Sequence, residues 1–295
     1  MLLDAIISIL VSLFIFLLLL RMFITTRDAY FNPLFGGIHR ATDPVMKPIH
    51  RALRKGPVDT SKVDFLVLIP IVFLLLFMSV VRAVLNPNLP LSISLIVTVM
   101  SFVDAAFLVY VVLILIFSVF YKYARFPSNP FVRAGFKIME PVYSFIGKYA
   151  PPLKNWPGPS AFILGFLLHW AVSAMGYSLL YTMKLPLGGS VEVTPGLIAF
   201  FALGISLGNL LRLATFFMWV VIIGALMSWI NPDPNNPIVQ LIRLMSEPIN
   251  RPFRKIVPNI GGIDISPIFS ILVLQLVART GSRLLGEIML QIPKM

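Results

Sequence analysis

Six long apolar runs constrain the fold of this chain more than any other feature. They cover 3–23, 65–85, about 96–120, 162–183, about 203–230 and 267–290. Each is close to the length of about 20 residues that an α-helix needs to cross about 30 Å of hydrocarbon. The composition agrees, because 58% of the residues are hydrophobic and only 12% are charged, against about 25% charged in soluble domains. The sequence therefore predicts an all-α integral membrane protein with six transmembrane helices.

The polar connections between these runs alternate between long and short, which predicts three helical hairpins in series. Most of the 24 Lys and Arg residues fall in the three long connections, at 24–64, 121–161 and 231–266. By the positive-inside rule these connections are cytoplasmic, and both termini lie outside. The net charge of +12 is then explained by topology, and no nucleic-acid partner is expected.

Each long connection repeats one device, an Asn-Pro pair followed by an acidic residue and a second proline. The interval from the asparagine to the acid is eleven residues in every copy. The pairs are Asn32-Pro33 with Asp43-Pro44, Asn129-Pro130 with Glu140-Pro141, and Asn236-Pro237 with Glu247-Pro248. We call 32–64, 129–160 and 231–267 the first, second and third elbows. A single membrane domain, 1–295, is thus expected to contain repeats at 1–88, 92–186 (divergent) and 195–295.

The third elbow shows what the device should build. Asparagine caps a helix and proline suits its first position, so Asn236-Pro237 opens one. Apolar residues then recur at helical spacing, which predicts an amphipathic helix lying flat in the membrane interface. We expect Pro248 to break this helix and Glu247 to pair with Arg251, as Asp43 pairs with Lys47. We also expect Glu140 to meet Ser144 and Ser266-Pro267 to cap the helix that re-enters the membrane.

The basic face of the first and third elbows should contact anionic lipid headgroups or an acidic loop of a partner protein. The residues expected to do so are Lys47, Arg51, Arg54, Lys55, Arg243, Arg251, Arg254 and Lys255. The small residues Gly204, Ser206 and Gly208 predict close helix packing, within the chain or between copies of it.

The stretch NPDPNNPIVQLIRLMSEPINRPFRKIVPNIGGIDISP resembles the repeat of the YggT family, called YlmG in some bacteria and plastids. The likeness includes the paired glycines Gly261 and Gly262 with Asp264 behind them. The first elbow keeps NP, DP and a basic run that ends at Asp64, while the second keeps only NP and EP. Family members usually carry two copies, and this chain has three.

The resemblance implies a small multi-pass protein of the bacterial cytoplasmic membrane or the plastid. Some bacterial members are linked with cell-division genes or osmotic stress, and plastid relatives with nucleoid distribution and cytochrome b6f maturation. The family brings no catalytic residues to carry over.

Three polar residues interrupt the apolar runs. His169 is expected to be hydrogen-bonded between packed helices, and a haem ligand is the sharper alternative. Asp104 and Arg212 lie near the starts of the third and fifth runs, where they could pair across helices, snorkel to the interface or line a polar path.

The sequence favours a protein that is not an enzyme. It contains no HExxH, and its G-x-S-x-G string, at 204–208, falls inside a long apolar run and not at the strand-to-helix turn of a nucleophile elbow. No metal-ligand or phosphate-loop pattern is evident. Cysteine is absent, which excludes disulfides and thiolate-held metals or clusters within the chain. We expect no cofactor and no metal, and we predict a scaffold, assembly factor or accessory subunit of a membrane complex. The alternative is a channel or transporter for ions or osmolytes.

Overall fold

The computed structural model describes residues 2–24, 26–53, 64–87, 89–123, 129–183, 194–230, 232–257 and 264–291. The chain divides into two compact units, Met1–Phe102 and Val103–Met295, and the boundary falls within one long helix. Every described element is helical, so the all-α prediction is confirmed.

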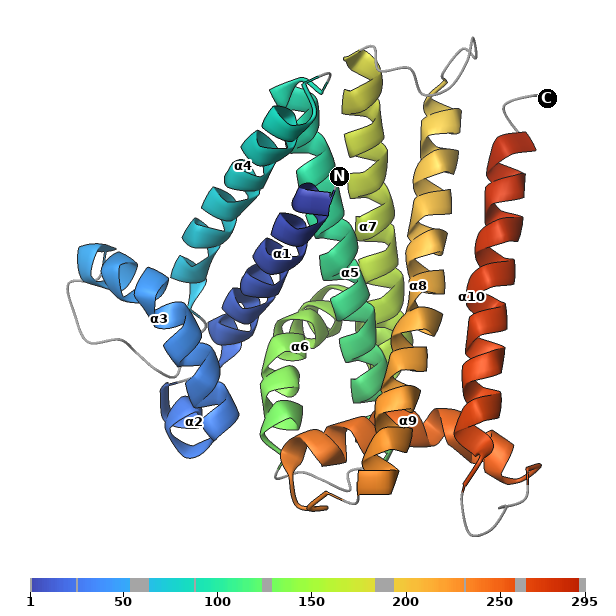
Figure 1. The fold of residues 1–295 in the computed structure, drawn as a ribbon. Helices are drawn as coiled ribbons and strands as arrows, with labels where there is room; N and C mark the ends of the chain where they lie inside the picture. The colour runs from blue at the N-terminus through green and yellow to red at the C-terminus, as the bar shows by residue number, and fades with distance from the viewer. Residues whose placement is uncertain are drawn as a thin grey trace. The chain divides into compact units, whose positions relative to one another are not determined.

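The first unit holds the first hairpin and the first elbow (Figure 1). Its elements are α1 (Leu2–Phe23), α2 (Thr26–Phe31), α3 (Pro33–Leu53), the 3-10 turn η1 (Phe65–Val67), α4 (Leu68–Leu85) and the beginning of α5 (Leu91–Tyr123). Helix α1 packs on both α3 and α4. The core between them is Ile15, Leu18, Met46, Val67 and Ile71, so the elbow helix contributes to the same core as the two spans.

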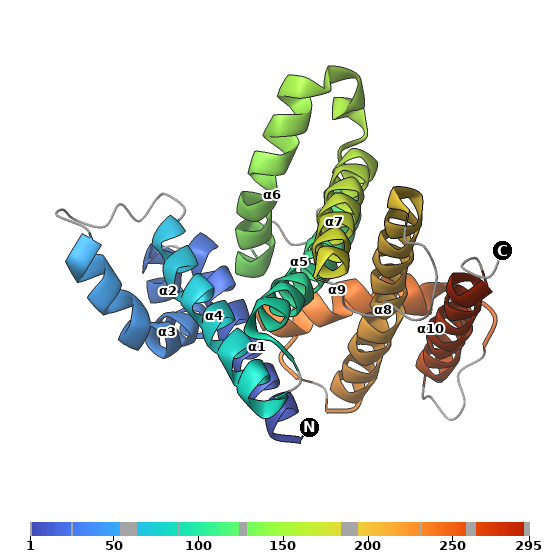
Figure 2. The ribbon, with the colours of Figure 1, turned by 90° about the horizontal axis from the view of Figure 1, so that it is seen from above.

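The second unit contains the rest of α5 and the other two elbows. Its elements are α6 (Pro130–Tyr149), the 3-10 turn η2 (Pro151–Asn155), α7 (Pro157–Thr182), α8 (Pro195–Ile230), α9 (Pro237–Arg254) and α10 (Ser266–Gln291). Helix α8 packs against α7, α9 and α10, and Figures 1 and 2 show α9 crossing beneath the ends of α8 and α10.

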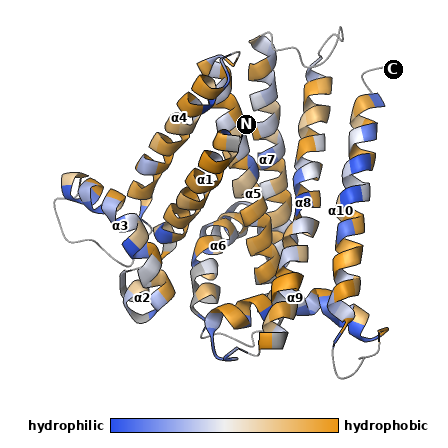
Figure 3. Ribbon diagram, viewed as in Figure 1, coloured by the Kyte–Doolittle hydropathy of each residue, from blue (hydrophilic) through white to orange (hydrophobic). Residues whose placement is uncertain are grey.

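Six described helices are long and apolar enough to cross a membrane, which confirms the six predicted spans. They are Leu3–Met22, Phe65–Leu85, Leu91–Ile116, Pro157–Thr182, Pro195–Ser228 and Ser266–Gln291. The hydropathy colouring of Figure 3 shows α1, α4 and α5 almost wholly hydrophobic, whereas α3 and α9 mix both kinds of residue.

The three elbow helices, α3, α6 and α9, begin as predicted. The side-chain oxygens of Asn32, Asn129 and Asn236 each accept a hydrogen bond from the backbone N–H two residues on, at 2.9–3.0 Å. The expected break at the second proline is wrong, because each helix continues through it. Pro44, Pro48, Pro248 and Pro252 stand on exposed positions, where the carbonyl that loses its helical donor is not sealed in a core.

Small residues allow close helix contacts, as expected for membrane helices. A methyl group added at Gly204 would run into Met289, and one at Gly281 would lie 2.7 Å from Leu211, so α8 and α10 meet there. Gly165 faces the ring of Tyr110 in the same way, and the Tyr110 hydroxyl donates to the carbonyl of Ala161 at 2.7 Å. Close packing within the chain at Gly204 is thereby confirmed.

Candidate functional site: the elbows and an intramembrane polar cluster

In the first elbow, a buried arginine ties the end of α1 to α3. The Arg21 side chain is only 6% exposed, and its Nη1 donates to Asp43 and Thr42, both at 2.7 Å, and to the carbonyl of His39 at 3.1 Å. Asp43 also pairs with Lys47 at 2.8 Å, so the predicted Asp43–Lys47 pair is confirmed. The acid of the repeated device therefore holds the elbow helix against the span.

In the third elbow, the acid serves a different pair. Glu247 binds Arg254 at 2.7 Å, and Arg254 also binds Asp264 at 2.6 Å. The predicted Glu247–Arg251 pair is wrong, since Arg254 reaches both carboxylates at once. Asp264 accepts from the backbone N–H of Ser266 at 2.9 Å, so the predicted Ser266 cap is wrong too: Asp264 caps α10.

The first and third elbows each end in an ion pair at the same position of the repeat. Eighteen residues after the capping asparagine stand His50 and Arg254. His50 contacts Asp64 at 2.7 Å, just as Arg254 contacts Asp264. In both repeats, then, a basic residue near the end of the elbow helix contacts the acid that precedes the returning span.

The electrostatics of these residues follow from burial and pairing. Burial by itself would raise the pKa of Asp43, but hydrogen bonds from Lys47 and Arg21 hold it below its usual value. Burial would also raise the pKa of Asp264, but hydrogen bonds from Ser266 and Arg254 outweigh this effect and lower the pKa. Burial, and then the charge of Arg21, lower the pKa of His39.

The second elbow is linked to the third. The Asn129 amide donates to the carbonyl of Pro237 and to the side chain of Gln240, both at 3.1 Å, so the capping asparagine of α6 also holds the start of α9. The expected contact between Glu140 and Ser144 is wrong, because the Ser144 hydroxyl donates to the carbonyl of Pro141 at 2.9 Å. Glu140 is exposed.

Exposed basic residues recur in register on the first and third elbows. Fifteen and nineteen residues after the capping asparagine stand Lys47 and Arg51 in one, and Arg251 and Lys255 in the other, and all four are exposed. Residues four apart share a helix face. Arg243 is exposed as well. Arg54, Lys55, Gly261 and Gly262 lie outside the described residues.

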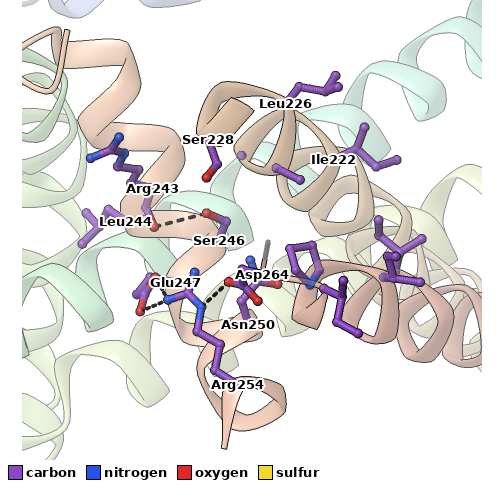
Figure 4. Close-up of a pocket in the computed structure, with 16 residues that line it drawn as sticks. Ile222, Leu226, Ser228, Arg243, Leu244, Ser246, Glu247, Asn250, Arg254 and Asp264 are labelled. Atoms are coloured by element: carbon purple, nitrogen blue, oxygen red, sulfur yellow. Dashed lines mark hydrogen bonds and ion pairs between the residues drawn. The ribbon is translucent and has the colours of Figure 1, made fainter. Parts of the chain in front are cut away.

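A cavity of about 770 Å³ opens where α8, α9 and α10 meet (Figure 4). Its walls include the apolar residues Ile222 and Leu226 of α8 and Ile268 and Ile271 of α10, and its polar side includes Arg243, Glu247, Asn250, Arg254 and Asp264. In Figure 4 the Arg254 side chain reaches between Glu247 and Asp264. The site is amphipathic, with apolar and charged residues in one space.

A second polar cluster lies within the spans of the second unit. His169 on α7 is buried, with Nδ1 2.8 Å from the Ser206 hydroxyl and Nε2 2.9 Å from Asp104. Asn209 donates to Asp104 at 2.9 Å and lies 3.2 Å from Nε2, and Phe107 stacks on the imidazole with ring centroids 4.2 Å apart. The expectation of a histidine hydrogen-bonded between packed helices is confirmed, and both ring nitrogens are occupied.

The Ser206 hydroxyl joins two helices of this cluster. Its oxygen lies 3.0 Å from the carbonyl oxygen of Ala202 in α8 and 2.8 Å from Nδ1 of His169 in α7. Ser206 is fully buried, so this Ser–His–Asp grouping does not expose a nucleophile at the surface of the chain.

Sequence reasoning placed some of these residues and missed others. Asp104 does not pair with Arg212, which is exposed on α8. Arg21 was missed because a charge at the end of an apolar run is explained by topology alone. Asn209 was missed as well, although its spacing of three from Ser206 places both on one helix face.

The fold and these sites define a multi-pass α-helical membrane protein built from repeated hairpins with capped amphipathic elbows. The family model described as CCB3/YggT matches residues 1–85 and 203–285, which together make up more than half of the chain. The chain therefore belongs to the CCB3/YggT family. The matched segments contain the first and third elbows, and the second elbow lies between them.

The relatives agree with this assignment. The chain is 31% identical over 163 residues to an uncharacterized protein of Haemophilus influenzae, across 55% of this chain and 80% of that protein. It is 36% identical over 59 residues to the uncharacterized protein YggT of Escherichia coli (strain K12), and 46% over 61 residues to an uncharacterized protein of Pseudomonas aeruginosa. These two matches cover 20% and 21% of this chain and 31% of each relative. No solved structure matches the chain.

Proposed function

We propose that this YggT-family protein is a non-enzymatic scaffold or accessory subunit of a membrane complex, whose elbows hold it to anionic headgroups. The observation that carries the proposal is the exposed basic pair at one register of two elbows, Lys47 with Arg51 and Arg251 with Lys255. A membrane surface attracts such residues by about 1 kcal/mol each. Lys47, Arg51 and Arg251 lie on amphipathic helices that are packed against spans, and Lys255 directly follows the second of these helices.

The apolar surface of the spans is the second support for a scaffold. Large side chains such as Phe73 on α4 and Leu276 on α10 are 68% and 64% exposed in the single chain. Lipid can cover them, and so can the helices of another membrane protein. A scaffold needs such a surface in addition to its anchor.

The orientation belongs to the same proposal. Basic elbows are retained on the cytoplasmic side of a bacterial inner membrane, which puts both termini outside. A protease-accessible tag at either terminus of cells with an intact inner membrane tests this. Protection of the tag until the inner membrane is opened contradicts it.

The test of the anchor uses the exposed pair of the third elbow. The full chain in nanodiscs of neutral lipid is titrated into vesicles that contain anionic lipid, and Arg251→Gln with Lys255→Gln is compared with the native chain. Two lost cations, at about 1 kcal/mol each, weaken association by roughly 30-fold at low salt. Arg212→Gln is the matched control, an exposed arginine outside the elbows, and equal losses in both variants refute the anchor.

The test of the scaffold is gentle purification from native membranes, with mass spectrometry of the proteins that co-migrate. A stoichiometric partner supports an accessory role and identifies the complex. A solitary chain or homo-oligomer after mild extraction refutes it.

A channel or transporter for ions is the second candidate, favoured by the contact of 2.9 Å between His169 and Asp104 within the spans. Ionisable residues within spans are costly and often mark ion or proton paths. Proton flux into vesicles that contain the reconstituted chain, lost in Asp104→Asn and kept in Arg212→Gln, would establish it. An absence of flux in the native chain at any imposed gradient rules it out.

A further inference from the structure

In the first repeat, the span before the elbow supplies a cation to the elbow helix, and the corresponding position of the third repeat supplies none. In the first elbow, the Arg21 guanidinium fills the space beside Thr42 and Asp43, which stand ten and eleven residues after the capping asparagine. The same positions of the third elbow are Ser246 and Glu247. Both line the cavity.

The position of Arg21 is taken by small residues in the third repeat. Arg21 precedes Asn32 by eleven residues, and Ala225 precedes Asn236 by the same interval. Ala225 and its neighbour Gly224 both line the cavity. A methyl group added at Gly224 would lie 2.9 Å from the Ser246 hydroxyl oxygen, so this part of α8 faces the same part of its elbow helix as Arg21 does.

A buried acceptor without a donor is found in the same cavity. Asn250 is 4% exposed, and its Oδ1 has no hydrogen-bond partner among the described residues. Its counterpart in the first elbow, fourteen residues after the capping asparagine, is Met46, which is fully buried in the core. Where the first repeat closes the space with a methionine, the third leaves an amide that needs a donor.

The charges around Asn250 specify the kind of donor. Glu247 and Asp264 share one arginine, Arg254, so the three side chains together carry a charge of −1. A cationic donor balances that charge, as Arg21 does for Asp43 in the first repeat. The exposed Arg243 on the rim of the cavity offers a separate cation to a phosphate.

We infer that this cavity binds the headgroup of an aminophospholipid, with its primary ammonium at Glu247 and Asn250. A lipid is favoured over a protein lysine because the walls Ile222, Leu226, Ile268 and Ile271 belong to two spanning helices. They lie at the elbow end of those helices, and an amphipathic elbow is expected at the boundary between headgroups and acyl chains. The cavity volume is also within the range of small-molecule sites, about 300–1,000 Å³.

The test compares lipids that differ in one feature. The delipidated full chain is incubated with phosphatidylethanolamine, phosphatidylcholine or phosphatidylglycerol of identical acyl chains, and bound lipid is measured by native mass spectrometry. Phosphatidylcholine keeps the phosphate and the positive charge but has no N–H donor. We expect phosphatidylethanolamine to bind at least about tenfold more tightly than phosphatidylcholine, the value of one charged hydrogen bond.

Two variants place residues of the first repeat at the corresponding positions of the third. Ala225→Arg supplies the internal cation and Asn250→Met removes the acceptor, so each should abolish the preference for phosphatidylethanolamine. Tryptophan-fluorescence melting shows which variants fold, and Asn250→Met decides the matter alone if Ala225→Arg does not. Arg251→Gln, outside the cavity, should keep the preference even if it weakens binding to anionic vesicles, which separates this proposal from the anchor.

Three results would overturn the assignment. Equal binding of phosphatidylethanolamine and phosphatidylcholine removes the role of the N–H donors. Strongest binding of phosphatidylglycerol indicates an anion site. A partner lysine that crosslinks to Glu247 in native membranes, and is not displaced by phosphatidylethanolamine, assigns the cavity to a protein.

Discussion

Replacing Asp43 by asparagine should lower the stability of the first unit far more than the partial exposure of the Asp43 side chain suggests. The change keeps the shape of the side chain but leaves the Arg21 guanidinium, 6% exposed, without its carboxylate. Loss of one partner of a buried pair costs about 3–5 kcal/mol. Asp43 is 22% exposed, and Arg21 keeps its bonds to Thr42 and the His39 carbonyl. We therefore expect the lower end, about 3 kcal/mol, whereas Lys47→Ala, at a side chain 61% exposed, should cost about 0.2–1 kcal/mol.

The chain has no cysteine, so one introduced thiol reports the opening of this unit. Ser79 on α4 is 1% exposed, and Ser79→Cys is nearly isosteric. In the regime where closing is faster than labelling, a loss of 3 kcal/mol raises the rate of maleimide labelling about 150-fold. Lys47→Ala should raise it at most about fivefold. If Asp43→Asn and Lys47→Ala accelerate labelling equally, the buried pair does not hold α1 to α3.

Three further outcomes follow from the same contacts. The pKa of His39 in the folded chain lies below its ordinary value of 6.5. Its contribution to stability is therefore present above about pH 6.5 and is lost as the pH falls through the folded pKa. Labelling at position 79 should accelerate on acidification below about pH 6.5, and His39→Gln should remove this part of the acceleration. Gly165→Ala should cost about 1–3 kcal/mol in tryptophan-fluorescence melting, because the Tyr110 ring must move, and Tyr110→Leu in the same chain should recover most of it; no recovery would mean that the ring is not the obstacle. His169→Leu leaves buried polar groups without their partner and should cost about 3 kcal/mol, which would be contradicted by a melting curve equal to that of the native chain.

Local and compositional features could be predicted from the sequence. The lengths of the apolar runs decided the spans, because hydrocarbon thickness and helical rise leave little freedom. The asparagine caps were predictable since the oxygen of Asn236 reaches an N–H only two residues away. The Asp43–Lys47 pair was predictable for the same reason, as both lie on one helical turn.

Contacts that depend on where the chain returns could not be predicted. Glu247 pairs with Arg254 and not with Arg251, because Arg254 also contacts Asp264, ten residues further on. The position of Asp264 is set by the connection to α10. The continuity of α9 through Pro248 reflects which face of the helix is exposed, which one sequence with several prolines does not settle. The grouping of His169 with Asp104 needs the packing of α5 on α7, and periodicity within a uniformly apolar helix carries no such information.

The proline pairs of α3 and α9 have a mechanical consequence. Two prolines four residues apart, at 44 and 48 and at 248 and 252, remove two hydrogen bonds, about one helical turn apart, from each helix. The loss of these bonds should lower the bending stiffness of the helix there. Spans change their tilt when bilayer thickness changes, and α8 and α10 both contact α9. We expect the two spans to be able to tilt separately about this part of α9, because the Asn236 cap and the Arg254–Asp264 pair lie on either side of Pro248. The elbow would thus combine fixed attachments at its two ends with a bending point between them.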